Sequence, residues 1–190
     1  VVKTVCFDPG HGGKDPGCSG KKYKEKDVSL AVSLKLGAYI EKNFPDVKVV
    51  YTRKTDVFVE LQERGDIANR NNADLFICIH CNANENKEAH GAETYVMGLK
   101  KAQGNLEIAK RENSAMLLEK DYKTKYDGFD PNSDEAYIIF NLMQNSFLDQ
   151  SQNLASKIQY YYKTKAKRVD KDVRQANFWV LWRTAMPSLL

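Results

Sequence analysis

The sequence predicts an α/β fold in which a mainly parallel central sheet has helices on both faces. Short apolar, β-branched runs alternate with stretches whose apolar residues recur at helical spacing, as in β-α-β units with right-handed crossovers. The chain has 190 residues, 42% of them hydrophobic and 28% charged, which suits one domain with a sizeable core. No apolar run approaches the roughly 18 residues that a transmembrane helix needs. We therefore expect a single domain over residues 1–190 and no transmembrane segment.

Each element before residue 98 has its own signal. The first strand is the apolar run from Val1 to Phe7, which Asp8-Pro9-Gly10 ends. A helix follows from about Asp27 and ends before Pro45. The remaining elements are a strand over 47–51, a helix that Asp56 caps and Asn71-Asn72 closes, a strand over 73–79 and a strand over 92–97.

Two of the three histidines follow strands. His11 lies in the Gly-rich turn after the first strand, and His80 follows the strand over 73–79. In a parallel sheet both emerge at the carboxyl edge, where open α/β sheets bind ligands. Glu25 lies in a charged loop just ahead of the first helix, whose positive end favours a carboxylate. Two imidazoles and one carboxylate are a zinc ligand set with one open position; the alternative is a solvated histidine on a Gly-rich turn.

Six groups of residues carry a family resemblance. They are Asp8-Pro9-Gly10-His11-Gly12-Gly13, Glu25-Lys26-Asp27-Val28, Thr52-Arg53-Lys54-Thr55-Asp56, Ile79-His80-Cys81-Asn82-Ala83, Gly91-Ala92-Glu93-Thr94-Tyr95, and Arg174-Gln175-Ala176-Asn177 through Met186-Pro187-Ser188. In this order, and over nearly the whole chain, they resemble the zinc-dependent N-acetylmuramoyl-L-alanine amidases of the type 3 cell-wall family. The resemblance implies an amidase catalytic domain that cleaves the amide between N-acetylmuramic acid and the L-alanine of the stem peptide in bacterial peptidoglycan. It also implies that His11, Glu25 and His80 hold one Zn²⁺.

No residue of this sequence, which ends at Leu190, matches the catalytic carboxylate of the family. The family places it just past a Pro-Ser step like Pro187-Ser188, and the sequence stops at Leu190. We therefore expect the general base beyond Leu190 and an incomplete final strand in this chain. Glu93 is the other family-matched carboxylate near the strand ends, and it fits a positioning role better than that of a substitute base. General acid/base catalysis is worth about 10²- to 10⁴-fold, so a chain without it should turn over poorly.

Two further positions are candidates for substrate binding. Asn82 adjoins His80, and Arg53 matches the family pattern. Alternatively, Asn82 only stabilises its own loop. For Arg53, as for Arg64, the structural alternative of an ion-paired residue is favoured.

About sixty residues separate the strand over 92–97 from the last motif, far more than an ordinary loop. Their apolar spacing predicts one helix through Leu106 and Leu117. A second helix begins at Ser133 and runs through Leu142 and Met143 to Ile158.

The inserted segment, about residues 101–150, resembles the regulatory insertion of division-associated amidases, in which a helix covers the zinc cleft. We predict that residues 101–126 form such a plug. Glu112 is the first candidate for the open metal position and Glu119 the second. Alternatively, these helices only widen the substrate groove or pack on the body.

Charge and cysteine content add little. The net charge of +4 favours an anionic partner only mildly, and no nucleic-acid-binding fingerprint is present. Cys6 and Cys78 are expected in the core. Cys18 and Cys81 lie near the site as spare ligands or a disulfide pair, of which we expect neither. The resemblance implies a secreted or periplasmic monomer whose signal peptide was removed, and it leaves room for an activator protein that relieves autoinhibition.

Two alternative functions remain. One is a non-catalytic peptidoglycan-binding remnant that keeps the metal ligands without the general base. The other is a different zinc hydrolase, such as a carboxypeptidase, which would need a basic pocket for a free carboxylate. No position clearly supplies that pocket.

Overall fold

Strands and helices alternate along the chain, as the sequence predicts. The computed structural model describes residues 1–84, 86, 88–98, 103–140 and 146–190. In chain order the elements are β1 (Thr4–Pro9), α1 (Glu25–Asn43), β2 (Lys48–Tyr51), α2 (Leu61–Arg70), β3 (Leu75–Ile79), β4 (Ala92–Val96), α3 (Gln103–Asn113), η1 (Ser114–Leu118), α4 (Tyr122–Lys125), α5 (Asp134–Phe140), α6 (Leu148–Thr164), β5 (Asp170–Gln175), α7 (Trp179–Trp182) and β6 (Ser188–Leu189). None of the described helices is long and apolar enough to cross a membrane.

The central sheet consists of two groups of strands joined at β6. Four strands pair in the order β2-β1-β3-β6, and each of these pairs is parallel. β4 and β5 form a second parallel pair. Tyr95 in β4 and Leu190 after β6 exchange two backbone hydrogen bonds of 2.7 and 2.9 Å, which is the pattern of an antiparallel pair. The mainly parallel sheet is therefore confirmed, with β4 and β5 running opposite to the other strands.

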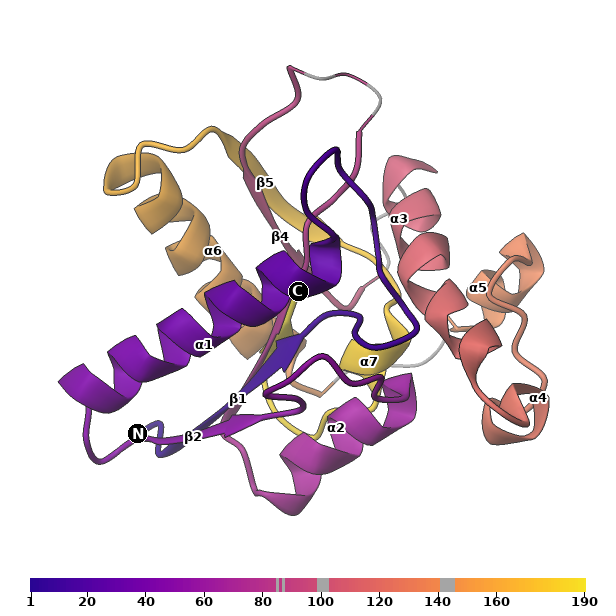
Figure 1. The fold of residues 1–190 in the computed structure, drawn as a ribbon, viewed down its shortest axis with the longest axis horizontal. Helices are drawn as coiled ribbons and strands as arrows, with labels where there is room; N and C mark the ends of the chain where they lie inside the picture. The colour runs from indigo at the N-terminus through magenta and orange to yellow at the C-terminus, as the bar shows by residue number, and fades with distance from the viewer. Residues whose placement is uncertain (85, 87, 99–102, 141–145) are drawn as a thin grey trace.

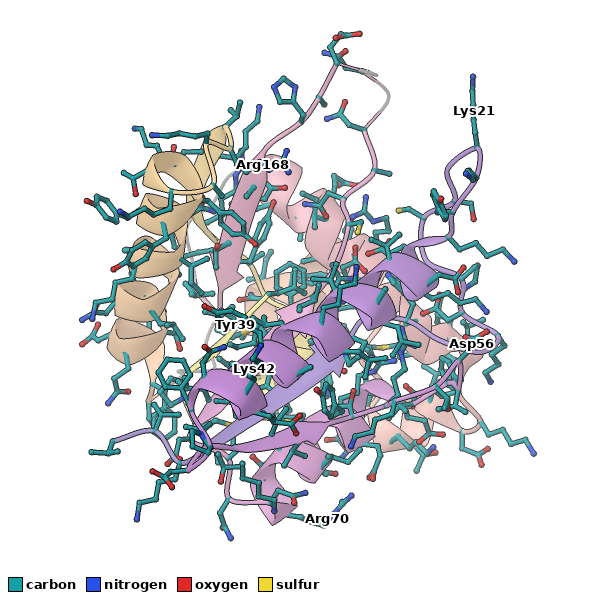
Figure 2. The ribbon with its side chains drawn as sticks, turned by 60° about the vertical axis from the view of Figure 1, so that its left-hand side comes forward. Lys21, Tyr39, Lys42, Asp56, Arg70 and Arg168 are labelled. Atoms are coloured by element: carbon teal, nitrogen blue, oxygen red, sulfur yellow. The ribbon has the colours of Figure 1, made fainter. Side chains whose placement is uncertain are left out.

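Helices cover both faces of this sheet. Because β1 lies between β2 and β3, right-handed connections place α1 and α2 on opposite faces, and Figure 1 shows them on either side of β1 and β2. Helix α6 packs along β4 and β5, and α2 packs on α7. Tyr39 and Lys42 project from the outer side of α1, and Arg168 projects from the turn between α6 and β5 (Figure 2). The faces of the helices and the sheet that point inward form the core, which includes Phe7, Phe76 and Leu181.

One of the two predicted helix starts is wrong. α1 begins at Glu25, two residues before the predicted start near Asp27, with the extended Lys24 as its N-cap. Asp56 is not the N-cap of α2, which begins five residues later at Leu61. The Asp56 carboxylate instead accepts the Gly13 amide at 2.7 Å and binds the Lys26 ammonium at 2.6 Å.

The insertion is attached to the body through its middle. Helices α3, α4 and α5 form a group beside α7 (Figure 1). The side chain of Asn113, 1% exposed, donates to the Tyr137 hydroxyl and the Asn177 carbonyl and accepts the Trp179 amide, at 2.8 to 2.9 Å. Aromatic rings from both parts surround this point: Tyr126, Phe129, Tyr137, Phe140, Trp179 and Trp182. The end of α3 is therefore part of the core.

The second predicted helix of the insertion is divided. α5 ends at Phe140 and α6 begins at Leu148. The predicted positions Leu142 and Met143 lie outside the described residues, as does Lys101 at the start of the predicted plug. α6 completes the cover of the sheet by packing on β4 and β5.

Candidate metal centre

The two histidines leave neighbouring strands at one edge of the sheet, as predicted. Pro9 at the end of β1 pairs with Ile79 at the end of β3, and the Gly10 amide donates to the Ile79 carbonyl at 3.0 Å. A Cβ on Gly10 would lie 2.4 Å from Nε2 of His80. Only glycine at position 10 therefore leaves room for the His80 ring against the turn.

Two buried arginines hold the turn that carries His11. His11 has a φ of 61°, which is uncommon for a residue other than glycine. Arg64 binds the Asp8 carboxylate at 2.8 Å and donates to the carbonyls of Pro9 and His11 at 2.9 and 2.8 Å. Arg53 donates to the carbonyls of Pro9 and Gly10 at 2.9 and 2.7 Å. These bonds fix the unusual backbone that directs His11 into the site.

Glu25 enters the site from the first turn of α1 and is 3% exposed. One carboxylate oxygen accepts the Cys18 amide at 2.9 Å, and the other accepts the Cys81 amide at 2.7 Å. Cys18 and Cys81 are free and half-buried. Their backbones thus position a carboxylate from both sides.

Four side chains meet at this point: His11, Glu25, His80 and Glu112. Each offers one ligand atom, and these atoms lie within 4.8 Å of one another. Nε2 of His11 lies 3.1 Å from Oε1 of Glu25 and 3.4 Å from Oε2 of Glu112. Nδ1 of His80 lies 3.0 and 3.1 Å from the same two oxygens.

A further carboxylate lies behind His11. Oδ2 of Asp15, a residue 9% exposed, lies 2.9 Å from Nδ1 of His11, and its Oδ1 accepts the Gly17 amide at 3.1 Å. A carboxylate on one ring nitrogen fixes the tautomer and leaves the lone pair of the other nitrogen facing the site. Sequence analysis missed Asp15, although a turn-forming Asp-Pro-Gly four residues after a candidate ligand was a usable signal.

The carboxylates and imidazoles of this cluster shift one another's pKa in opposite directions. Burial opposes the charge of His11, but Asp15 and Glu25 raise its pKa above the ordinary value. Burial likewise opposes the charge of His80, and Cys78 and Glu112 raise its pKa well above the ordinary value. Burial would raise the pKa of Glu25, yet the two imidazoles hold it far below its usual range.

The arrangement fits a divalent cation. Nε2 of His11 and Oε2 of Glu112 are buried and have no hydrogen-bond partner among the described residues. Buried polar atoms are almost always paired, so this pair of atoms indicates a ligand between them. Two imidazole nitrogens and two carboxylate oxygens are donors that zinc accepts.

Comparison with known proteins agrees with this geometry. A family model described as N-acetylmuramoyl-L-alanine amidase matches residues 5–190. The chain belongs to this amidase family. The amidase AmiA of Escherichia coli K12 is 31% identical over 191 residues, which cover 99% of this chain and 64% of AmiA.

Solved amidase structures share the fold. An amidase from Clostridium difficile 630 has a TM-score of 0.68 at 28% identity, covering all of this chain and 77% of that protein. The CwlD amidase of Clostridioides difficile, solved in complex with the GerS lipoprotein, has a TM-score of 0.66 at 25% identity, over 99% of this chain and 80% of CwlD. The chain spans less than two thirds of its curated E. coli relatives, with 64% of AmiA and 44% of AmiC.

The other amidase residues predicted from the sequence lie in different places. Asn82 is exposed beside the cluster, and its amide group bonds Glu93 on β4. Arg53 is 3% exposed and has a structural role, but its guanidinium donates to backbone carbonyls and not to a carboxylate as the expected ion pair would. Glu119 does not reach the metal position. Its carboxylate accepts the Leu61 amide at 2.9 Å and caps α2 in place of Asp56.

Proposed function

We propose that this domain hydrolyses the amide between N-acetylmuramic acid and L-alanine in peptidoglycan, with one Zn²⁺ held by His11, Glu25 and His80. The observation that supports it most directly is the convergence of these three donors at the carboxyl edge of the sheet, in a chain of the amidase family. When bound, zinc polarises the amide carbonyl and lowers the pKa of water at the site. The mainly parallel sheet supplies the rigid edge on which the donors sit.

The residues of the chain have separate tasks in this proposal. Asp15 keeps the Nδ1 proton of His11, so that Nε2 faces the metal. The amides of Cys18 and Cys81 keep Glu25 ionised and fixed. Leu190 lines the cavity together with His11, His80 and Glu112. A carboxylate placed just past Leu190, as the family resemblance implies, would act as the general base there.

Glu112 serves as an internal inhibitor in this proposal. Its Oε2 lies 3.4 and 3.1 Å from the two ring nitrogens that face the metal position. It is 6% exposed, so its carboxylate excludes a substrate carbonyl from the same place. Because the adjacent Asn113 is bound into the core, activation requires a local shift of α3 and not detachment of the whole insertion.

We also propose an activator protein that moves α3, and a location outside the cytoplasmic membrane where peptidoglycan lies. The complex of CwlD with a lipoprotein is a precedent for a partner of a similar domain. The domain itself is proposed to act as a monomer, because four donors of a single chain already suffice for a metal site.

Metal analysis combined with a peptidoglycan assay tests the proposal. The parent, Glu112→Ala and both proteins extended past Leu190 by a strand that carries the family glutamate would be incubated with purified peptidoglycan, and new L-alanine amino termini counted. All should bind one zinc. Extension should raise the rate by about 10²- to 10⁴-fold, and Glu112→Ala should raise it further, on the order of tenfold.

Histidine variants supply the control. His11→Ala and His80→Ala should lose zinc, whereas His90→Ala should keep it because His90 is exposed and lies outside the cluster. Absence of zinc from the parent would refute the ligand set. Zinc and peptidoglycan binding without cleavage by the extended Glu112→Ala protein would favour the remnant function.

A further inference from the structure

A row of polar side chains leads from β5 to the metal cluster. Nε of Arg174 lies 3.0 Å from Oε2 of Glu93. Oε1 of Glu93 accepts a hydrogen bond from Nδ2 of Asn82. Oδ1 of Asn82 accepts one from Nη2 of Arg111 at 2.9 Å. Arg111 in turn binds Oε1 of Glu112 through Nε and Nη2, at 3.0 and 2.8 Å. The row thus joins three strand ends to helix α3.

This row determines which end of the Asn82 amide faces the site. The Glu93 carboxylate can only accept, so the NH₂ group of Asn82 must point toward it. Arg174 holds the other Glu93 oxygen and keeps the carboxylate in place. The carbonyl oxygen of Asn82 is consequently presented toward the metal cluster as a fixed hydrogen-bond acceptor.

Arg111 and Glu112 together present an N–H group to Asn82 and an oxygen to the metal position. Nη2 of Arg111 donates both to Oδ1 of Asn82 and to Oε1 of Glu112. The other Glu112 oxygen faces the two imidazoles. An N–H donor therefore contacts Asn82 while an oxygen faces the metal position, and these are the two kinds of group that a peptide-like amide would bring.

We propose that Asn82 is a substrate-positioning residue whose Oδ1 accepts the N–H of the scissile amide, and that Arg111 inhibits by occupying this acceptor. The substrate N–H replaces the Arg111 N–H when α3 shifts, and the lactyl carbonyl replaces Glu112. Glu93 and Arg174 orient Asn82 without touching the substrate. When the C–N bond breaks and the nitrogen gains a proton, the resulting L-alanine amine still has an N–H for Asn82.

The inference rests on the proposed amidase function and predicts opposite effects of one substitution. In a chain that retains Glu112, Asn82→Ala frees Arg111 and should raise the amidase rate several-fold at saturating peptidoglycan, where the lost substrate contact does not limit the rate. When the Glu112→Ala background also carries Arg111→Ala, the same substitution removes only the substrate contact. There it should raise KM about tenfold with kcat nearly unchanged, because the bond is made in both ground and transition states. A merely structural role would lower activity in both backgrounds.

A binding measurement tests the same contact without catalysis. Calorimetric titration of zinc-loaded Glu112→Ala protein with N-acetylmuramoyl-L-alanyl-D-isoglutamine should show about tenfold weaker binding for Asn82→Ala. Asn82→Asp, combined with Glu93→Gln so that residue 93 can donate to the new carboxylate, keeps the acceptor oxygen and should bind within about threefold of the parent. Asn84→Ala is the matched control, since Asn84 is an exposed asparagine two residues further along the same loop.

The outcomes separate the two proposals. If the extended Glu112→Ala enzyme cleaves peptidoglycan and Asn82→Ala behaves like Asn84→Ala, the role of Asn82 is refuted and the amidase function stands. Equal binding of the muramoyl peptide by both asparagine variants overturns the role of Asn82 even without cleavage. Opposite effects in the two backgrounds, with retained binding by Asn82→Asp, establish it.

Discussion

Replacing Asp15 should weaken metal binding without removing a ligand. The carboxylate lies 2.9 Å from Nδ1 of His11 and is 9% exposed, so its hydrogen bond to the imidazole is shielded from water. Bonds of this kind to charged groups contribute about 1.5–3 kcal/mol, which corresponds to roughly 10- to 100-fold in zinc affinity. Asp15→Asn keeps an acceptor oxygen, so its zinc affinity should fall about tenfold. Asp15→Leu removes the acceptor, so its zinc affinity should fall by close to 100-fold.

Competition for zinc with a coloured chelator measures this affinity directly. Asp56→Asn is the control, because Asp56 holds the same loop through Gly13 and Lys26 without touching a histidine. It should leave zinc affinity within about twofold of the parent. A folded Asp15→Leu protein that binds zinc as tightly as the parent would show that the Asp15 bond does not position His11.

Three further predictions concern the framework of the site. Arg64→Met breaks the buried pair with Asp8 and should cost roughly 3–5 kcal/mol in chemical denaturation at pH 7. Burial alone would raise the pKa of the Asp8 carboxyl, but Arg64 holds that pKa below its ordinary 3.8. The stability that the ion pair adds is therefore present above pH 3.8 and is lost as the pH falls through the lowered pKa. In acid, the difference in unfolding free energy between the parent and Arg64→Met should shrink. Glu119→Ala removes the cap of α2 and should cost about 1–2 kcal/mol, seen as faster hydrogen exchange in its first turn; unchanged exchange there contradicts the capping role. Gly17→Ala would place a Cβ 2.5 Å from the His11 ring and should weaken zinc binding, whereas Gly128→Ala, equally strained at φ 74° but with open space around it, should not.

The strand ends were predictable, and with them two of the clustered donors. Buried strands in a parallel sheet have continuous apolar sequences, and the residue that follows such a run must emerge at the carboxyl edge. This reasoning placed His11 and His80 together from the sequence alone, which the pairing of β1 with β3 confirms. Glu25 was placed beside them from its position just ahead of the first helix, and the family pattern then supported it, because a carboxylate near a helix start has many ordinary roles.

Contacts between distant loops were not predictable. Asp56 has the residue type of an N-cap, but a lysine and a free amide of another loop compete for its carboxylate. The cap that α2 uses comes from Glu119, 58 residues away, and no local pattern indicates it. Glu112 was singled out by resemblance to a regulatory helix, whereas its link through Arg111 to Asn82 depends on how α3 packs on the body.

The position of β6 also has a consequence for folding. This short strand lies between β3 and β4, and the bonds from Leu190 to Tyr95 are what tie β4 and β5 to the other strands. The β4–β5 pair therefore cannot join the other four strands until β6, which begins more than ninety residues after the end of β4, has been synthesised and has paired. Because such distant pairing slows folding, we expect the two halves to stay separate and open late into synthesis.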